Sequence, residues 1–371
     1  MNLDFSNDQK LLQDEASKFL IKEEALKASR AVMEAKSNYD PELWQKIVQL
    51  GWTGIRIHEE FGGLGLGHLE LCVIAEELGR QLAPVPFSSS VYLFTEALLE
   101  FASEEQKTQI LPQLVSGEVV GTFAMAETAA APTEQNLVVN YADGKLSGKK
   151  IAVPDAEVAS HVIVVAKENN HATMCLVNLK DASVTVEKQN NIDESRGYFS
   201  IDFKNTPAEI IGDSGSGWLH AEKILNHAAT LFAFEQIGGA QETLDMANAY
   251  AKERYAFGRP IGSFQAIKHK VADMYISLQL ARSNCYYGAW ALSNDAPELP
   301  TAAATARVSA TKAFYECSKE NIQTHGGMGA TWEFDCHLFY RRARLLSSNI
   351  GSQGIWKDKL ITSLEKSNSP T

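Results

Sequence analysis

A change in hydrophobic period along the chain constrains its fold more than any other feature. Up to about residue 113 apolar residues recur at helical spacing, as in Leu71, Ile74 and Leu78. Between residues 119 and 207 the pattern changes to short β-branched runs separated by turn residues, and from about residue 217 long helical patterns return. The sequence therefore predicts an α+β multidomain protein, with a helical domain over residues 1–117, a β domain over 118–215 and a four-helix bundle over 216–371.

Glycine and proline mark the expected breaks within these regions. The glycine-rich run from Gly62 to Gly67 predicts a turn or a close backbone approach, and the first domain is expected to end near Pro112 and Gly117. Asp143-Gly144 lies between two short strand patterns and predicts a hairpin turn. The bundle helices are expected over 221–255, 263–294, 301–326, and from about 334 or 337 to 364.

Composition excludes several classes of protein. With 46 acidic and 34 basic residues the net charge is −12, which disfavours a nucleic-acid partner. No apolar stretch reaches ~18 residues and the first residues do not resemble a signal peptide, so we expect a cytoplasmic protein that does not enter a membrane. The five cysteines are odd in number and widely spaced, which predicts free thiols. The nine histidines show no metal-ligand spacing, so no metal site is expected.

Four segments then resemble the signatures of the acyl-CoA dehydrogenase family, in the family's order. They begin at Gly51-Trp52, at Ala126-Glu127, at Glu253-Arg254 and at Gln323-Thr324, and together they span most of the chain. The resemblance implies a helical N-terminal domain, a β-barrel-like middle domain and a C-terminal four-helix bundle. It also implies FAD-dependent α,β-dehydrogenation of an acyl-CoA thioester, in a homo- or heterotetramer with a related subunit and with electron-transfer flavoprotein as acceptor.

The third and fourth signatures carry the cofactor candidates. A flavin nucleotide needs a cation and backbone donors at its pyrophosphate, and small residues where the backbone approaches it. The resemblance places such groups around the AMP half of FAD, largely across a subunit interface; they are Arg254, Phe257, Gln265, Gln323, Gly326 and Gly327. The alternative for Arg254 is a surface cation paired with Glu253.

The middle domain departs from the family pattern. The flavin-ring loop of the family usually reads Thr-Glu-Pro-x-x-Gly-Ser, whereas residues 126–132 of this chain read Ala-Glu-Thr-Ala-Ala-Ala-Pro. A Trp-x-Thr that the family places against the flavin is replaced by Ala152-Val153-Pro154. Most of the hydroxyls and glycines that would contact the ring are therefore missing.

The position of the catalytic base departs from the family pattern as well. Abstraction of the α-proton requires a carboxylate beside the thioester. The two positions at which the family carries its glutamate match Ile350 and Ala228 here. Glu235 lies seven residues, about 10 Å, beyond Ala228 on the same predicted helix face, and is the candidate base. A structural glutamate paired with a neighbouring helix or subunit is the alternative.

Two interpretations of function follow. In the first, the chain is a dehydrogenase subunit of the divergent bacterial type that acts on sterol or bile-acid side chains, often as a heteromer. In the second, it is a non-catalytic partner that completes the FAD site of a related active subunit. Gly238-Gly239 also has two interpretations, since it could leave room for a bulky acyl group or allow close packing of helices.

Overall fold

The computed structural model describes residues 5–368, which form two units. The helical unit comprises residues up to 30, residues 68–83 and residues from 229 onward. The sheet unit comprises residues 31–67 and 84–228. This grouping by packing takes non-consecutive segments of the chain, so the three consecutive domains expected from the sequence stay a prediction.

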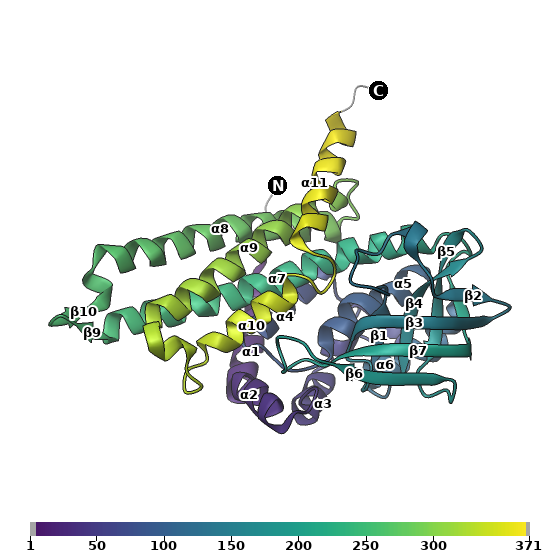
Figure 1. The fold of residues 1–371 in the computed structure, drawn as a ribbon, viewed down its shortest axis with the longest axis horizontal. Coiled ribbons are helices and arrows are strands. Elements are labelled where there is room, and N and C mark those ends of the chain that lie inside the picture. The colour runs from purple at the N-terminus through teal and green to yellow at the C-terminus, as the bar shows by residue number, and fades with distance from the viewer. Residues whose placement is uncertain (1–4, 369–371) are drawn as a thin grey trace. The chain divides into compact units, whose positions relative to one another are not determined.

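Eleven α-helices are present in the described residues. Figure 1 shows α7, α8 and α9 lying lengthwise beside one another. A hairpin of β9 (Tyr255–Ala256) and β10 (Arg259–Pro260) lies where α7 ends and α8 begins. The helices are α1 (Asn7–Lys22), α2 (Ala25–Ala35), α3 (Pro41–Gln49), α4 (His68–Arg80), α5 (Glu96–Phe101), α6 (Glu104–Ser116), α7 (Gly217–Glu253), α8 (Gln265–Ser293), α9 (Leu299–His325), α10 (Cys336–Leu346) and α11 (Gln353–Asn368). A π-helix, Ser88–Thr95, precedes α5.

An eight-stranded mixed sheet forms the centre of the second unit. Its path is β6-β7-β3-β2-β4-β5-β8, and β1 pairs with β4 in parallel. The strands are β1 (Gly121–Ala124), β2 (Asn140–Ala142), β3 (Lys145–Pro154), β4 (His161–Glu168), β5 (His171–Asn178), β6 (Val184–Gln189), β7 (Tyr198–Pro207) and β8 (Glu209–Ile211). No pairing joins β6 to β8 in the described residues, so the barrel-like expectation is corrected to an open sheet.

Local sequence explains where the elements start and stop. Asp143 and Gly144 both have positive φ, +48° and +73°, and join β2 to β3 in the expected two-residue hairpin. Helix α6 ends at Ser116 because Gly117 adopts φ +76° as its cap. The expected end near Pro112 and Gly117 falls at Gly117, and Pro112 lies inside α6.

The last expected helix is two helices, α10 and α11, which corrects the prediction of one. Gly351 has φ +108°, a value that a helix cannot accommodate. The break is held from two sides, since Trp356 Nε1 donates to the Ile350 carbonyl at 3.2 Å and Arg307 donates to the Leu346 carbonyl and to Asn349 Oδ1. Apolar periodicity alone does not reveal such a break.

Helices α4 and α7 cross at two glycines. A Cβ added to Gly79 would lie 1.9 Å from the Glu235 carbonyl oxygen, and one added to Gly238 would lie 1.9 Å from the Glu76 carbonyl oxygen. A Cβ on Gly239 would lie 2.4 Å from the Phe314 ring. Both glycines of the Gly238-Gly239 pair therefore serve close helix packing.

The structure also describes the five cysteines and the hydrophobic character of the helices. All five cysteines are free and buried, as predicted. Among residues 5–368, no helix combines the length and the apolar character needed to cross a membrane.

Candidate cofactor site and active site

The β9–β10 hairpin presents an aromatic side chain to solvent. Strands β9 (Tyr255–Ala256) and β10 (Arg259–Pro260) are joined by Phe257 and Gly258, with φ of +52° and +79°. Phe257 is 94% exposed, although positive φ is costly for a bulky residue and exposure of an aromatic ring brings no burial energy. An outlier of this kind is typical of a residue that contacts a ligand or a partner.

Arg254 and Gln265 flank the hairpin and are both exposed. The Ile261 amide donates to the Arg254 carbonyl at 2.7 Å, which closes the connection between α7 and α8. Arg259 lies over the Phe264 ring at 4.1 Å, so the hairpin packs against the start of α8.

The end of α9 supplies the remaining cofactor candidates. Gln323, Gly326 and Gly327 are exposed, and Gly326 ends the helix with φ +62°. A Cβ added to either glycine meets no atom within 4 Å, so the backbone here borders open space. The His325 ring stacks on Tyr250 of α7 with centroids 4.0 Å apart, which fixes the turn against the end of α7.

All six cofactor candidates thus lie at one end of the helical unit. Stacking of Tyr250 on His325 joins the end of α7 to the end of α9, and the Lys270–Glu320 ion pair joins the start of α8 to α9. The result is one exposed surface with a guanidinium, two amides, an aromatic ring and two accessible backbone positions. These groups suit a nucleotide pyrophosphate and its adenosine.

Glu235 is buried in α7 with 4% of its surface exposed. Arg342 of α10, itself 1% exposed, places Nη1 3.6 Å from Glu235 Oε1 and donates from Nη2 to the Leu82 carbonyl at 3.3 Å. The carboxylate is therefore compensated by a buried guanidinium, which the sequence did not indicate because the partners are about a hundred residues apart.

The two positions that match the family's glutamates hold apolar side chains, and both are at least partly buried. Ala228 is fully buried in α7, and Ile350 is half-buried in the break between α10 and α11. Arg307 holds this break and also donates to Gln236 Oε1 at 2.9 Å. The segment that carries Ile350 is therefore fixed by a buried cation.

An ion pair that the sequence analysis missed joins β3 to the loop after β1, whose sequence was compared above with the family's flavin-ring loop. Lys150 Nζ lies 2.7 Å from Glu127 Oε1, and the two side chains are 0% and 8% exposed. Burial lowers the pKa of Lys150 to about 8, although Glu127 opposes the change. Strand alternation could have revealed it, since Lys150 shares a face with the buried Leu146.

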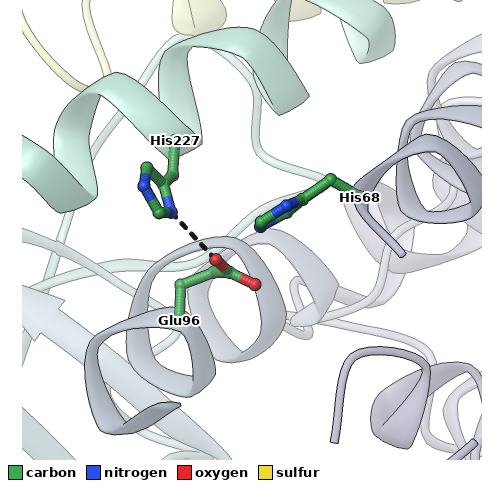
Figure 2. A group of neighbouring side chains, drawn as sticks. All are labelled: His68, Glu96 and His227. Carbon is green, nitrogen blue, oxygen red and sulfur yellow. Dashed lines mark hydrogen bonds and ion pairs between the residues drawn. The ribbon is translucent and has the colours of Figure 1, made fainter. Parts of the chain in front are cut away.

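A second buried pair lies in the sheet unit, where Figure 2 shows His227 directed at Glu96. His227 Nδ1 is 3.0 Å from Glu96 Oε2, and Arg56 Nε donates to Glu96 Oε1 at 3.2 Å. Glu96 is fully buried and stands directly after the π-helix, and its two carboxylate oxygens contact groups from two separate segments. Neither residue stood out in the sequence.

Comparisons with known proteins agree with the order of the signatures. The model of the acyl-CoA dehydrogenase N-terminal domain matches residues 6–118, and that of the C-terminal domain matches residues 215–363. Acyl-CoA dehydrogenase IpdE2 of Mycolicibacterium smegmatis is 32% identical over 91% of this chain and 93% of that protein. The chain belongs to the acyl-CoA dehydrogenase family.

Other members of the acyl-CoA dehydrogenase family match over similar lengths. The short-chain specific mitochondrial enzyme of Sus scrofa is 30% identical over 87% of this chain and 82% of that protein. The Tcur3481-Tcur3483 steroid ACAD is 27% identical with a TM-score of 0.88, and the match covers 97% of this chain and 98% of that one. The family and the helix–sheet–helix architecture predicted from the four signatures are therefore confirmed.

Proposed function

We propose that this chain takes part in FAD-dependent α,β-dehydrogenation of an acyl-CoA thioester, as one subunit of a heteromeric acyl-CoA dehydrogenase. The observation that carries the proposal is the exposed surface formed by Arg254, Phe257, Gln265, Gln323 and Gly326-Gly327. Every one of these groups faces solvent at a single end of the helices. A subunit that lends them to a site completed by a second chain would present them in this way.

The residues at this surface fit the AMP half of FAD. Arg254 would pair with the pyrophosphate, Gln265 and Gln323 would bind polar edges, and Phe257 would cover an aromatic face. The open space over Gly326 and Gly327 admits close approach of phosphate oxygens to the backbone. When bound, FAD would supply the hydride acceptor for the β-carbon.

Glu235 is the proposed general base of this chain. It is the carboxylate that α7 carries two turns beyond Ala228, and it would take the α-proton of the thioester. Arg342 would hold the carboxylate in one orientation before the substrate binds.

A second candidate function is favoured by the same ion pair. A carboxylate compensated by a buried guanidinium is also the expected form of a structural glutamate. The ring-side loop, with alanine at 129, 130 and 131, has few side chains to bind an isoalloxazine ring. In this version the chain is a non-catalytic partner that completes the FAD site of a related subunit.

Similarity suggests the substrate class and the setting. The likeness to the Tcur3481-Tcur3483 steroid ACAD supports a steroid or related lipid acyl-CoA and a partner of the same family. We further propose a cytoplasmic location and electron-transfer flavoprotein as the acceptor, as the family implies.

Glu235→Gln tests the two functions in the complex co-purified with its dehydrogenase-like partner. Steroid side-chain CoA thioesters and butyryl-CoA would be added anaerobically, and loss of the flavin absorbance followed by stopped flow. Glu242→Gln is the matched control, since Glu242 lies seven residues further along α7 and pairs with Arg80 at 3.0 Å. If Glu235 is the base, flavin reduction falls at least ~100-fold in Glu235→Gln alone. Equal rates in both variants would refute this role and leave the non-catalytic subunit.

A further inference from the structure

The connection between β1 and β2, residues 125–139, is closed by one carboxylate. Glu127 stands near its start, and its Oε2 accepts a hydrogen bond from the Val138 amide at 2.6 Å. Oε1 of the same side chain accepts from the Val139 amide at 3.1 Å. Glu127 thus ties the two ends of the loop together across eleven and twelve residues.

Lys150 fixes this closed loop to the sheet. Its Nζ donates to the Met125 carbonyl at 2.9 Å and to Glu127 Oε1 at 2.7 Å. Lys150 lies where the β3–β7 register shifts, and the shift turns the next amide, that of Ile151, toward the Ala126 carbonyl at 2.8 Å. The start of the loop is therefore held by a side chain and by the backbone of one strand.

The buried charges specify geometry more than they add stability. Removing an ammonium and a carboxylate from water is costly, and apolar residues of similar size often give an equally stable protein. Here both charges are directed at backbone groups of the loop, namely the Met125 carbonyl and the Val138 and Val139 amides. Their effect is to select one loop conformation.

The tip of the loop depends on that conformation. Residues 128–131 are exposed, and the tip is closed by Thr128 Oγ1, which accepts from the Ala130 amide at 3.2 Å, and by Asn136 Nδ2, which donates to the Ala131 carbonyl at 2.9 Å. The three alanines have no hydrogen-bonding side chains, so a ligand at this tip would be met largely by backbone groups. Backbone groups bind a ligand well only when the chain is held in place.

We infer that Glu127 and Lys150 are positioning residues, which hold the backbone of residues 126–131 in the place where the flavin ring is bound. This inference rests on the proposed function for the presence of FAD. The buried ion pair would order the loop through its backbone and would replace the ordering that the missing side chains otherwise provide.

The test uses the complex co-purified with its partner and reconstituted with FAD. Lys150→Met removes the cation, and Glu127→Gln keeps an acceptor but removes the charge. Lys149→Met is the matched control, because Lys149 is the neighbouring lysine of β3 and is half exposed in its contact with Glu187. Hydrogen exchange of the Val138 and Val139 amides reports the loop, while FAD affinity and the shape of the visible flavin band report the ring.

In Lys150→Met and Glu127→Gln we expect amide exchange at residues 138–139 to be at least ~10-fold faster, FAD to bind ~10-fold more weakly, and the flavin band to shift. Lys149→Met should match the unaltered complex in all three. Unchanged amide exchange in both variants would overturn the inference, as would faster exchange with unchanged FAD affinity and spectrum. Failure of the shared FAD site itself is a separate result, since the unaltered complex would then bind no FAD at all.

Discussion

Gly238→Ala should destabilise the protein, because α4 and α7 cross at that glycine. The added methyl group would start 1.9 Å from the Glu76 carbonyl oxygen and 3.0 Å from the Arg80 amide nitrogen. Ordinary contact begins at 3.4 Å, so the two helices would have to separate by about 1.5 Å. The obstacle is backbone, which cannot rotate away as the end of a side chain does.

The magnitude follows from two opposing effects. Overpacking of a tight interior costs about 1–3 kcal/mol and occasionally more, whereas alanine gains about 1 kcal/mol over glycine in a helix interior. Separation would also stretch the ion pair between Glu76 and Arg282, now 2.6 Å, at the crossing. We expect a net loss of about 2 kcal/mol in the free energy of unfolding.

Urea denaturation followed by circular dichroism, at one protein concentration, measures this change. Gly354→Ala is the control, because its added Cβ would meet Ser352 Oγ at 3.7 Å, an ordinary contact within a helix. The control should lose no stability. Equal midpoints for Gly238→Ala and the unaltered protein would refute the packing argument, and a change confined to substrate preference would show instead that Gly238 makes room for an acyl group.

Three further predictions concern buried or open groups. Burial lowers the pKa of Lys150 from 10.5 to about 8. Between these two pH values the unfolded chain binds a proton that the folded protein has released. The free energy of unfolding therefore rises with pH in this range. In urea titrations, the free energy of unfolding of the unaltered protein should rise relative to that of Lys150→Met by up to about 3 kcal/mol from pH 7.5 to 10.5. A constant difference between the two free energies would contradict the assignment. Gly327→Val should leave urea stability within about 0.5 kcal/mol, because space above Gly327 is open, yet weaken FAD binding to the complex ~10-fold by fluorescence titration; equal affinity would argue against a cofactor contact. Arg307→Met should cost about 1–3 kcal/mol and speed amide exchange over residues 347–352, because buried acceptors lose their donor; unchanged exchange would show that Trp356 alone holds the break.

Much of the fold follows from patterns that are local in sequence. The helical and strand periods gave the order of the elements, and Asp143-Gly144 gave a hairpin turn because both residues tolerate positive φ. The break between α10 and α11 was missed, because it depends on Gly351 and on donors from Arg307 and Trp356 that only folding brings near. Sheet closure was likewise beyond the sequence, since strand patterns do not state which strands pair at the edges.

The residues of the candidate site likewise fall into those that short motifs reveal and those that depend on tertiary contacts. Arg254, Phe257 and Gly326-Gly327 belong to short signatures, so they could be named from the sequence and the structure then places them at one end of the helices. The ion pairs of Glu235 with Arg342 and of Glu127 with Lys150 depend on tertiary contacts, which no local pattern encodes. A glutamate in an apolar helix could be recognised as unusual, but its partner could not be found.

The most direct test of the proposed role is the visible absorption spectrum of the purified chain, alone and co-expressed with its nearest dehydrogenase-like partner, expressed as flavin per subunit. A shared site predicts little flavin in the chain alone and about one FAD per two chains in the complex. A ratio near one for the chain alone would contradict the shared site and indicate a self-sufficient homo-oligomeric flavoprotein.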